Sequence, residues 1–183
     1  MKKMFTIFTM FIILLVSASP SFAHDLPGGG GETWGWKYVG SHWPSTTTTY
    51  FEATSDTWES RFKNGEAKFE SETGNRFSLI ERTSSDTSNF IESYSCSSCT
   101  WVARRTFTSI SADHPTRWRI QFNSAKSANS WTTVAAHEIG HVYGLADLYE
   151  SYNDERLMYG YDNGTRYLDV LEKDGLDYVY NVY

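Results

Sequence analysis

Short stretches in which apolar and polar residues alternate dominate the first two thirds of the chain. A period of two places alternate side chains on one face of a sheet, so each stretch predicts a strand with one buried face. β-branched and aromatic residues, which favour strands, are frequent in them. The predicted strands span residues 46–51, 76–82, 90–94, 101–107 and 118–122.

A helical spacing replaces the alternation after residue 53. Thr54 or Ser55 is a suitable N-cap for a helix whose apolar stripe contains Trp58, Phe62 and Phe69. Gly65 lies in the middle of this segment, where glycine weakens a helix. The pattern therefore predicts one amphipathic helix between the first and second strands.

Two more helices are predicted in the last third of the chain. One begins at Ser130 or Thr132 and ends near Gly144, and the other covers residues 167–180. The segment between them is irregular and rich in Tyr, Asp and Gly. In the last helix we expect four side chains to face inward: Leu168, Leu171, Leu176 and Val179. The order of elements indicates an α+β fold, with one twisted, mainly mixed sheet and a small C-terminal subdomain that contains one helix.

The N-terminus has the pattern of a secretory signal peptide. Lys2 and Lys3 are followed by an apolar run over residues 4–16 and by a small-x-Ala site that ends at Ala23. The alternative is a membrane anchor, which needs about 20 apolar residues, and this run is shorter. We therefore expect a secreted, extracellular protein without a membrane anchor after cleavage.

The composition divides the chain into three regions and argues against nucleic acid as a partner. Residues 1–23 are the expected signal peptide, residues 24–42 a Gly-rich linker or short N-terminal segment, and residues 43–183 the folded domain. Removal of Lys2 and Lys3 with the signal changes the formal net charge from −6 to −8. An acidic chain without a basic run is unsuited to nucleic acid.

The chain has two cysteines, in the sequence Cys96-Ser97-Ser98-Cys99. In an oxidising compartment, the first interpretation is a local disulfide that closes a tight loop. A redox-active pair normally begins a helix, whereas this pair lies between predicted strands. The third interpretation, a second zinc site, would require two further ligands, and none lies nearby at a fitting spacing.

The second predicted helix contains His137-Glu138-Ile139-Gly140-His141. Residues four apart lie on one face of a helix, so both imidazoles can bind one zinc ion at about 2.0–2.1 Å. Glu138 is then beside the metal and can take a proton from a bound water. A surface helix that carries two histidines by chance is the alternative.

Gly144 and Asp147 extend this motif. Glycine can end the helix with positive φ, and the chain can then bring Asp147 to the metal as a third ligand. Two imidazoles, one carboxylate and one open position are the ligands of a catalytic zinc site. Glu172 on the last helix is the alternative third ligand.

The pattern HExxHxxGxxD followed by Leu157-Met158 resembles the metzincin clan of zinc peptidases. Most of that clan has histidine as third ligand. Asp147 in this place, with Tyr149 after it, is similar to the snapalysin-like branch of small secreted bacterial neutral proteases. The resemblance covers residues 134–161, in which Val134-Ala135-Ala136 also resembles matrixins. Over residues 43–130 it depends only on the order of elements.

The resemblance implies a zinc metalloendopeptidase that hydrolyses extended polypeptides. His137, His141 and Asp147 would bind one catalytic Zn²⁺, with Glu138 as general base and acid and Met158 as the residue of the Met-turn beneath the metal. Met158 as an ordinary core residue is the alternative. Candidates for a pocket wall or for support of the transition state are Tyr143, Tyr159 and Tyr161. The acids show no calcium-loop spacing, which leaves structural calcium open.

We expect a monomeric enzyme whose substrate pairs with an edge strand of the sheet. Residues 118–122, which directly precede the zinc helix, are the expected edge. His24, His42 and His114 are expected to be surface or packing residues. A secreted binding or effector module that uses zinc only for stability is the alternative function. Residues 24–42 lying across the cleft would add self-inhibition.

Overall fold

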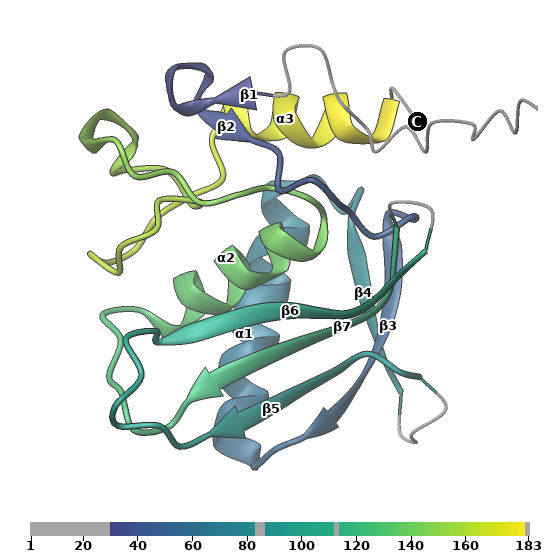
Figure 1. Cartoon of the computed structure of the whole chain (residues 1–183), viewed down its shortest axis with the longest axis vertical. Coiled ribbons are helices and arrows are strands. Elements are labelled where there is room, and N and C mark those ends of the chain that lie inside the picture. Colours follow the sequence, from purple (N-terminus) through teal and green to yellow (C-terminus); the bar gives the residue numbers. More distant parts are fainter. Residues whose placement is uncertain (1–29, 83–86, 112–113, 182–183) are drawn as a thin grey trace, which may run out of the picture.

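The computed structural model describes residues 30–82, 87–111 and 114–181 (Figure 1). The expected signal peptide, His24 and the rest of the Gly-rich segment up to residue 29 lie outside them. Within these ranges the chain is α+β, with a five-stranded mixed sheet and three α-helices, as expected. The strands are β1 (Gly30–Gly31), β2 (Trp36–Lys37), β3 (Thr47–Ala53), β4 (Ser78–Arg82), β5 (Phe90–Tyr94), β6 (Ala103–Ser111) and β7 (His114–Asn123). The helices are α1 (Asp56–Glu72), α2 (Trp131–Val142) and α3 (Val170–Asn181), with short 3₁₀ turns at Glu32–Trp34 and Ser151–Asn153.

The large sheet has the strand order β4-β3-β5-β7-β6. Neighbouring strands are parallel except for the hairpin of β6 and β7. The expectation that residues 118–122 form an edge is wrong, because β7 pairs with β5 on one side and with β6 on the other. The edge strand next to α2 is β6. The chain forms this outer strand first, and β7 then pairs between β6 and β5.

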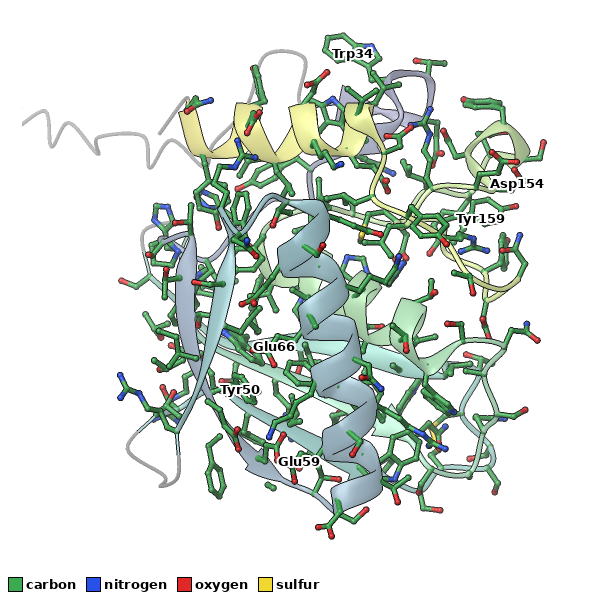
Figure 2. The ribbon with its side chains drawn as sticks, turned by 180° about the vertical axis from the view of Figure 1, so that it is seen from behind. Trp34, Tyr50, Glu59, Glu66, Asp154 and Tyr159 are labelled. Atoms are coloured by element: carbon green, nitrogen blue, oxygen red, sulfur yellow. A yellow bond between two sulfur atoms is a disulfide. The ribbon has the colours of Figure 1, made fainter. Side chains whose placement is uncertain are left out.

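Helices α1 and α2 pack on the same face of this sheet (Figures 1 and 2). Alternate residues of β7, which include Trp118 and Phe122, are fully buried beneath them. Phe122 stacks on Trp58 of α1 with ring centroids 5.5 Å apart, and it lies edge-on to Trp131 of α2 at 6.0 Å. The aromatic stripe predicted on α1 therefore forms the centre of the core.

The two helices cross closely at Gly65. A Cβ atom on Gly65 would lie 2.4 Å from Cβ of Ala135 and 2.8 Å from the backbone nitrogen of Ala136. The glycine that we expected only to weaken α1 thus allows α2 to approach it. Ala135 and Ala136, the residues of α2 at this contact, lie directly before His137. The crossing therefore sets how far the two histidines lie from the sheet.

Residues 30–42 belong to the folded unit. Trp36 is buried and its ring packs on Tyr178 of α3 at 5.4 Å. Backbone hydrogen bonds join Val39 N to Gly144 O at 2.9 Å and Ala146 N to Lys37 O at 2.8 Å. The boundary expected at residue 43 therefore does not separate these residues from the domain.

Helix α3 lies beside this segment (Figure 1), where Tyr178 meets Trp36 of β2. It begins at Val170, later than the pattern predicted, and Leu176 and Val179 are buried as expected. Leu168 is also buried, although it precedes the helix. Leu171 was wrongly assigned to the inner face, because it is 36% exposed. It lies on the same side of α3 as the exposed Asp174 one turn later, whereas Glu172, Leu176 and Val179 form the buried face.

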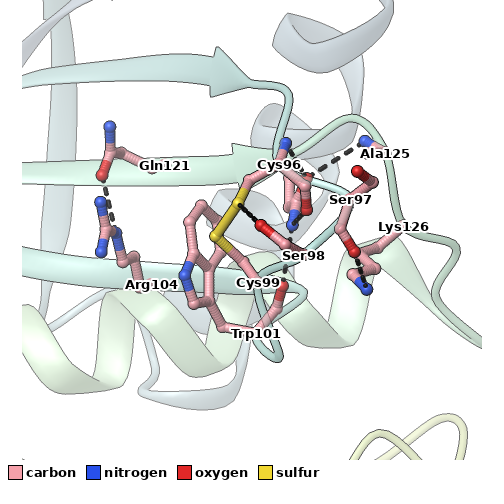
Figure 3. Close-up of a disulfide and its surroundings, with 10 residues drawn as sticks. Cys96, Ser97, Ser98, Cys99, Trp101, Arg104, Gln121, Ala125 and Lys126 are labelled. Atoms are coloured by element: carbon pink, nitrogen blue, oxygen red, sulfur yellow. Dashed lines mark hydrogen bonds between the residues drawn. A yellow bond between two sulfur atoms is a disulfide. The ribbon is translucent and has the colours of Figure 1, made fainter.

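Cys96 and Cys99 form a disulfide bond, the first of the three alternatives (Figure 3). The loop is fixed to the end of β7 by the buried Asn123. Its Oδ1 accepts from the backbone nitrogen of Cys96 at 2.9 Å, and its Nδ2 donates to the carbonyls of Cys96 and Trp101. The loop therefore holds the beginning of the β6 segment in place.

His42 and His114 are packing residues, as expected. Their rings contact each other edge-on at 4.7 Å, and His42 also lies against Tyr180 at 4.8 Å. Within the described residues, no helix is long and apolar enough to cross a membrane.

Replacement of Gly65 by Ala tests the helix crossing. Alanine normally stabilises a helix interior by about 1 kcal/mol relative to glycine. Here we expect the opposite, a loss of about 1–3 kcal/mol in the free energy of unfolding, because the added methyl group overpacks the interface. Urea denaturation measures the change. Asn64→Ala, at the exposed neighbouring position, is the matched control and should be neutral or stabilising. A more stable Gly65→Ala variant would contradict the close crossing.

A second prediction concerns the buried Tyr50 and the half-buried Glu66 beside it (Figure 2). The Tyr50 hydroxyl donates to Oε2 of Glu66 at 3.0 Å. Burial raises the pKa of Glu66 to about 7. A carboxyl group whose pKa is higher in the folded state binds more protons there, so stability is full below about pH 4.5 and declines as the pH rises through 7. We expect Glu66→Gln to match the wild-type free energy of unfolding at pH 5 and to exceed it at pH 8. Equal stabilities at both pH values would contradict this.

Candidate metal centre

Helix α2 is fixed at both ends by local sequence. Oγ of Ser130 accepts from the backbone nitrogen of Thr133 at 3.2 Å, which satisfies one free donor of the first turn. At the other end Gly144 has a φ of 102°, and Leu145 N donates to Gly140 O at 3.0 Å. A Cβ on Gly144 would lie 2.9 Å from Cβ of His42. Glycine is therefore required for both the conformation and the space, and the chain reverses as predicted.

This reversal brings Asp147 to the two histidines of α2. Oδ1 of Asp147 lies 3.0 Å from Nε2 of His137 and 3.6 Å from Nε2 of His141. Each residue offers one ligand atom, and the three atoms lie within 4.8 Å of one another. The structure thus brings together the three residues that the motif predicted as ligands.

Backbone carbonyls orient both imidazoles. Nδ1 of His137 donates to Leu157 O at 2.9 Å, and Nδ1 of His141 donates to Leu145 O at 2.6 Å. A carbonyl oxygen only accepts hydrogen bonds, so each Nδ1 carries the hydrogen and the neutral ring has its lone pair on Nε2. This arrangement is typical of histidines that bind a metal through Nε2.

The electrostatics of the three groups favour a cation between them. Burial lowers the pKa of His137, but hydrogen bonding to Asp147 and the charges of Glu138 and Asp147 outweigh this effect and raise it overall. Burial alone would raise the pKa of Asp147, yet hydrogen bonds with His137 and His141 hold it well below its usual range. Two nitrogen lone pairs and a carboxylate oxygen repel one another unless a proton or a metal ion lies between them. The donor set fits zinc, which accepts imidazole nitrogen and carboxylate oxygen together.

Glu138 lies beside this group on the wall of an open cleft with a volume of about 670 Å³. Glu138 is 5% exposed, and its Oε2 atom has no hydrogen-bond partner among the described residues. A buried carboxylate oxygen without a partner is costly. The costly position is explained if this oxygen acts on a molecule that enters the cleft.

Met158 lies directly beneath α2. A Cβ on Gly140, the residue before His141, would lie 2.5 Å from Sδ of Met158, so the thioether contacts the helix backbone between the two histidines. Met158 is fully buried. Its carbonyl accepts from Leu148 N at 2.8 Å, which ties this turn to the loop that carries Asp147. These contacts place it as an apolar floor under the site.

The candidate tyrosines have different locations. Tyr159 and Tyr161 line the cleft, and their rings contact each other at 5.4 Å. Tyr143 does not line it: the side chain is fully buried, stacks on Phe69 and donates to the carbonyl of Ser78. Its expected role in a pocket is wrong, because the last turn of α2 directs it into the core.

Tyr149 was recognised in the motif but not assigned a role. It lines the cleft, and burial and then the negative charge of the nearby Asp147 raise its pKa. A Cβ on Gly160 would lie 2.4 Å from the Tyr149 ring, so the glycine makes room for it. In the sequence, the feature that points to Tyr149 is its position two residues after Asp147.

Glu32 supports the same loop from outside. Its carboxylate accepts from the backbone nitrogens of Tyr149 and Glu150 and from Nδ2 of Asn153, at 3.0–3.3 Å. Residues 30–42 thus hold the loop that follows Asp147, and Val39 is the residue of this segment that lines the cleft. No local pattern in the sequence indicates this contact, which joins positions more than a hundred residues apart.

Glu172 is not close to the ligand group, so the alternative third ligand is wrong. It is fully buried and accepts from the backbone nitrogens of Met158 at 2.7 Å, Asp169 at 2.9 Å and Leu157 at 3.3 Å. Its carboxylate therefore holds the backbone of the turn whose carbonyl orients His137. Burial raises the pKa of Glu172 to about 7.

Comparison with protein-family models gave no match, and none of the curated proteins matches the chain. The site is therefore interpreted from its own residues.

Substitution of Glu172 separates a structural role from a ligand role. Glu172→Ala leaves the backbone nitrogens of Met158 and Asp169 without their acceptor, whereas Leu157 N retains the carbonyl of Tyr167. Each lost partner costs about 1–3 kcal/mol, so the variant should be markedly destabilised in urea. Glu172→Gln retains an acceptor oxygen, so we expect a smaller loss and unchanged binding of zinc in a competition assay. Loss of zinc from the folded Gln variant would show that Glu172 is a ligand after all.

Proposed function

We propose that the chain is a secreted zinc-dependent endopeptidase that hydrolyses peptide bonds of extracellular proteins. One observation carries the proposal: Nε2 of His137, Nε2 of His141 and Oδ1 of Asp147 converge beside Glu138 at an open cleft. A structural zinc site has four protein ligands, whereas three ligands and an open side are typical of catalysis. A site built only for stability would not need Glu138.

We further propose that the fold is of the metzincin type, in its snapalysin-like form. The features that support this are the helix end at Gly144, the aspartate ligand and the methionine floor contacted by Gly140. Export through the N-terminal signal is proposed from the sequence of residues 1–23 alone.

In this mechanism a bound zinc ion would polarise the scissile carbonyl and make the attacking water more acidic. His137 and His141 hold their Nε2 atoms in place because their Nδ1–H groups are engaged by backbone carbonyls. The free Oε2 of Glu138 takes a proton from the attacking water and then delivers it to the leaving amine. Tyr149 lies on the cleft wall, close enough for the Asp147 charge to raise its pKa.

The substrate is proposed to lie extended along β6. This strand is the free edge of the sheet on the side of α2, and the segment Thr100–Arg105 lines the cleft. An extended peptide can add to such an edge through backbone hydrogen bonds. Tyr159 and Tyr161 form the opposite wall.

Hydrolysis of casein by the mature chain, residues 24–183, tests the proposal. We expect cleavage that a zinc chelator abolishes and that added zinc restores. Glu138→Gln should bind zinc as the wild type does but lose at least about 100-fold in rate, because general acid–base catalysis contributes about 10²–10⁴-fold.

Asp147→Ala is the companion variant. Removal of one of three ligands should weaken zinc binding by more than the roughly 10–100-fold that loss of a ligand's hydrogen-bond partner produces. Tyr161→Phe, on the cleft wall, is the control and should retain zinc. Full zinc occupancy without any cleavage of casein or of unfolded protein substrates would contradict the peptidase and favour a binding module.

A further inference from the structure

Six charged residues line the cleft: Arg104, Arg105, Arg166, Glu138, Asp147 and Asp162. Two of the arginines have partners within the protein. Nη1 of Arg166 donates to Tyr159 O at 2.9 Å and its other Nη group to Tyr161 O. Nε of Arg104 donates to Oε1 of Gln121 at 2.8 Å, a bond that Figure 3 shows.

Arg105 has a different environment. Its partner in the β6–β7 ladder is Ile120, a fully buried residue on the face that α1 and α2 cover, so Arg105 lies on that face too. The guanidinium carbon lies 3.9 Å above the ring of Phe107. Its Nε atom is buried and has no hydrogen-bond partner among the described residues, none of whose carboxylates is in ion-pair contact with it.

Arg105 is half-buried, and a charge in such a place is costly unless it has a partner. Burial lowers the pKa of Arg105 to about 10, and only the charges of Glu138 and Asp147 oppose this. In the proposed site, those two acids also lie beside the bound zinc ion. When zinc is bound, its two positive charges are matched by Asp147 and Glu138, and Arg105 is left without a counterion.

We propose that Arg105 binds a carboxylate of the substrate and makes the enzyme prefer peptides with an anionic group close to the scissile bond. This inference rests on the proposed function and names its substrate class. The planar guanidinium is suited to two parallel hydrogen bonds with a carboxylate. The carboxylate belongs either to an acidic side chain or to the free C-terminus of the peptide.

Binding of peptide hydroxamates tests this without turnover. Four capped ligands form two pairs, which carry a single Glu or Gln on the amino side or on the carboxyl side of the hydroxamate. A third pair differs only in a free or amidated C-terminus. Dissociation constants for the zinc-loaded chain are measured by tryptophan fluorescence. We expect at least one charged member to bind at least about tenfold more tightly than its neutral partner. Which pair shows the difference identifies the source of the carboxylate.

Three variants assign the preference to Arg105. Arg105→Gln should abolish the difference while retaining affinity for the neutral ligands, and Arg105→Lys should keep part of it. Arg104→Gln, at the exposed neighbouring position whose side chain pairs with Gln121, is the matched control and should keep it entirely. The relative values of kcat/KM for Glu and Gln peptides should follow the same order.

Equal binding of charged and neutral ligands by the wild type would overturn the assignment. So would a preference that survives in Arg105→Gln, or an equal loss for both members of a pair. Discrimination among hydroxamates without cleavage of any peptide would instead overturn the proposed function and leave the assignment of Arg105 intact. If the zinc-loaded chain binds none of the hydroxamates, both proposals fail.

Discussion

The candidate site depends on two hydrogen bonds from imidazole rings to backbone carbonyls. His137 donates to the carbonyl of Leu157, and His141 donates to that of Leu145. Each bond fixes a tautomer and turns Nε2 toward Asp147. Because the two carbonyls belong to the two loops that follow α2, the ligand atoms converge only when both loops are in place. The irregular final third of the chain is therefore as important for the chemistry as the helix that carries the motif.

Several distant contacts serve to hold those loops. Glu172 fixes the methionine turn through backbone N–H groups, and Glu32 fixes the loop after Asp147. Gly144 allows the reversal between helix and loop. All three act on backbone rather than on the ligands themselves. This arrangement explains why a site with three ligands requires an N-terminal segment and a C-terminal helix in addition to the sheet.

Local patterns predicted most of the elements, because alternation and helical stripes reflect contacts with the core. The ligand group was predicted because a helix fixes the spacing of His137 and His141. Pairing in the sheet was not predictable: β6 and β7 have similar patterns, and only the pairing of β7 with β5 makes β6 the edge. The roles of Tyr143 and Arg105 depend on which face of an element each side chain occupies. The contact of Glu32 joins residues far apart in sequence, and no local pattern encodes it.

The X-ray absorption spectrum of the zinc-loaded chain at the zinc edge tests the central claim most directly. The account predicts one zinc per chain, with two imidazole nitrogens at about 2.0–2.1 Å and carboxylate and water oxygens at about 2.0–2.2 Å. Replacement of Asp147 should remove one oxygen from this shell. A shell without two imidazoles, one with sulfur, or one that Asp147→Ala leaves unchanged would contradict the account.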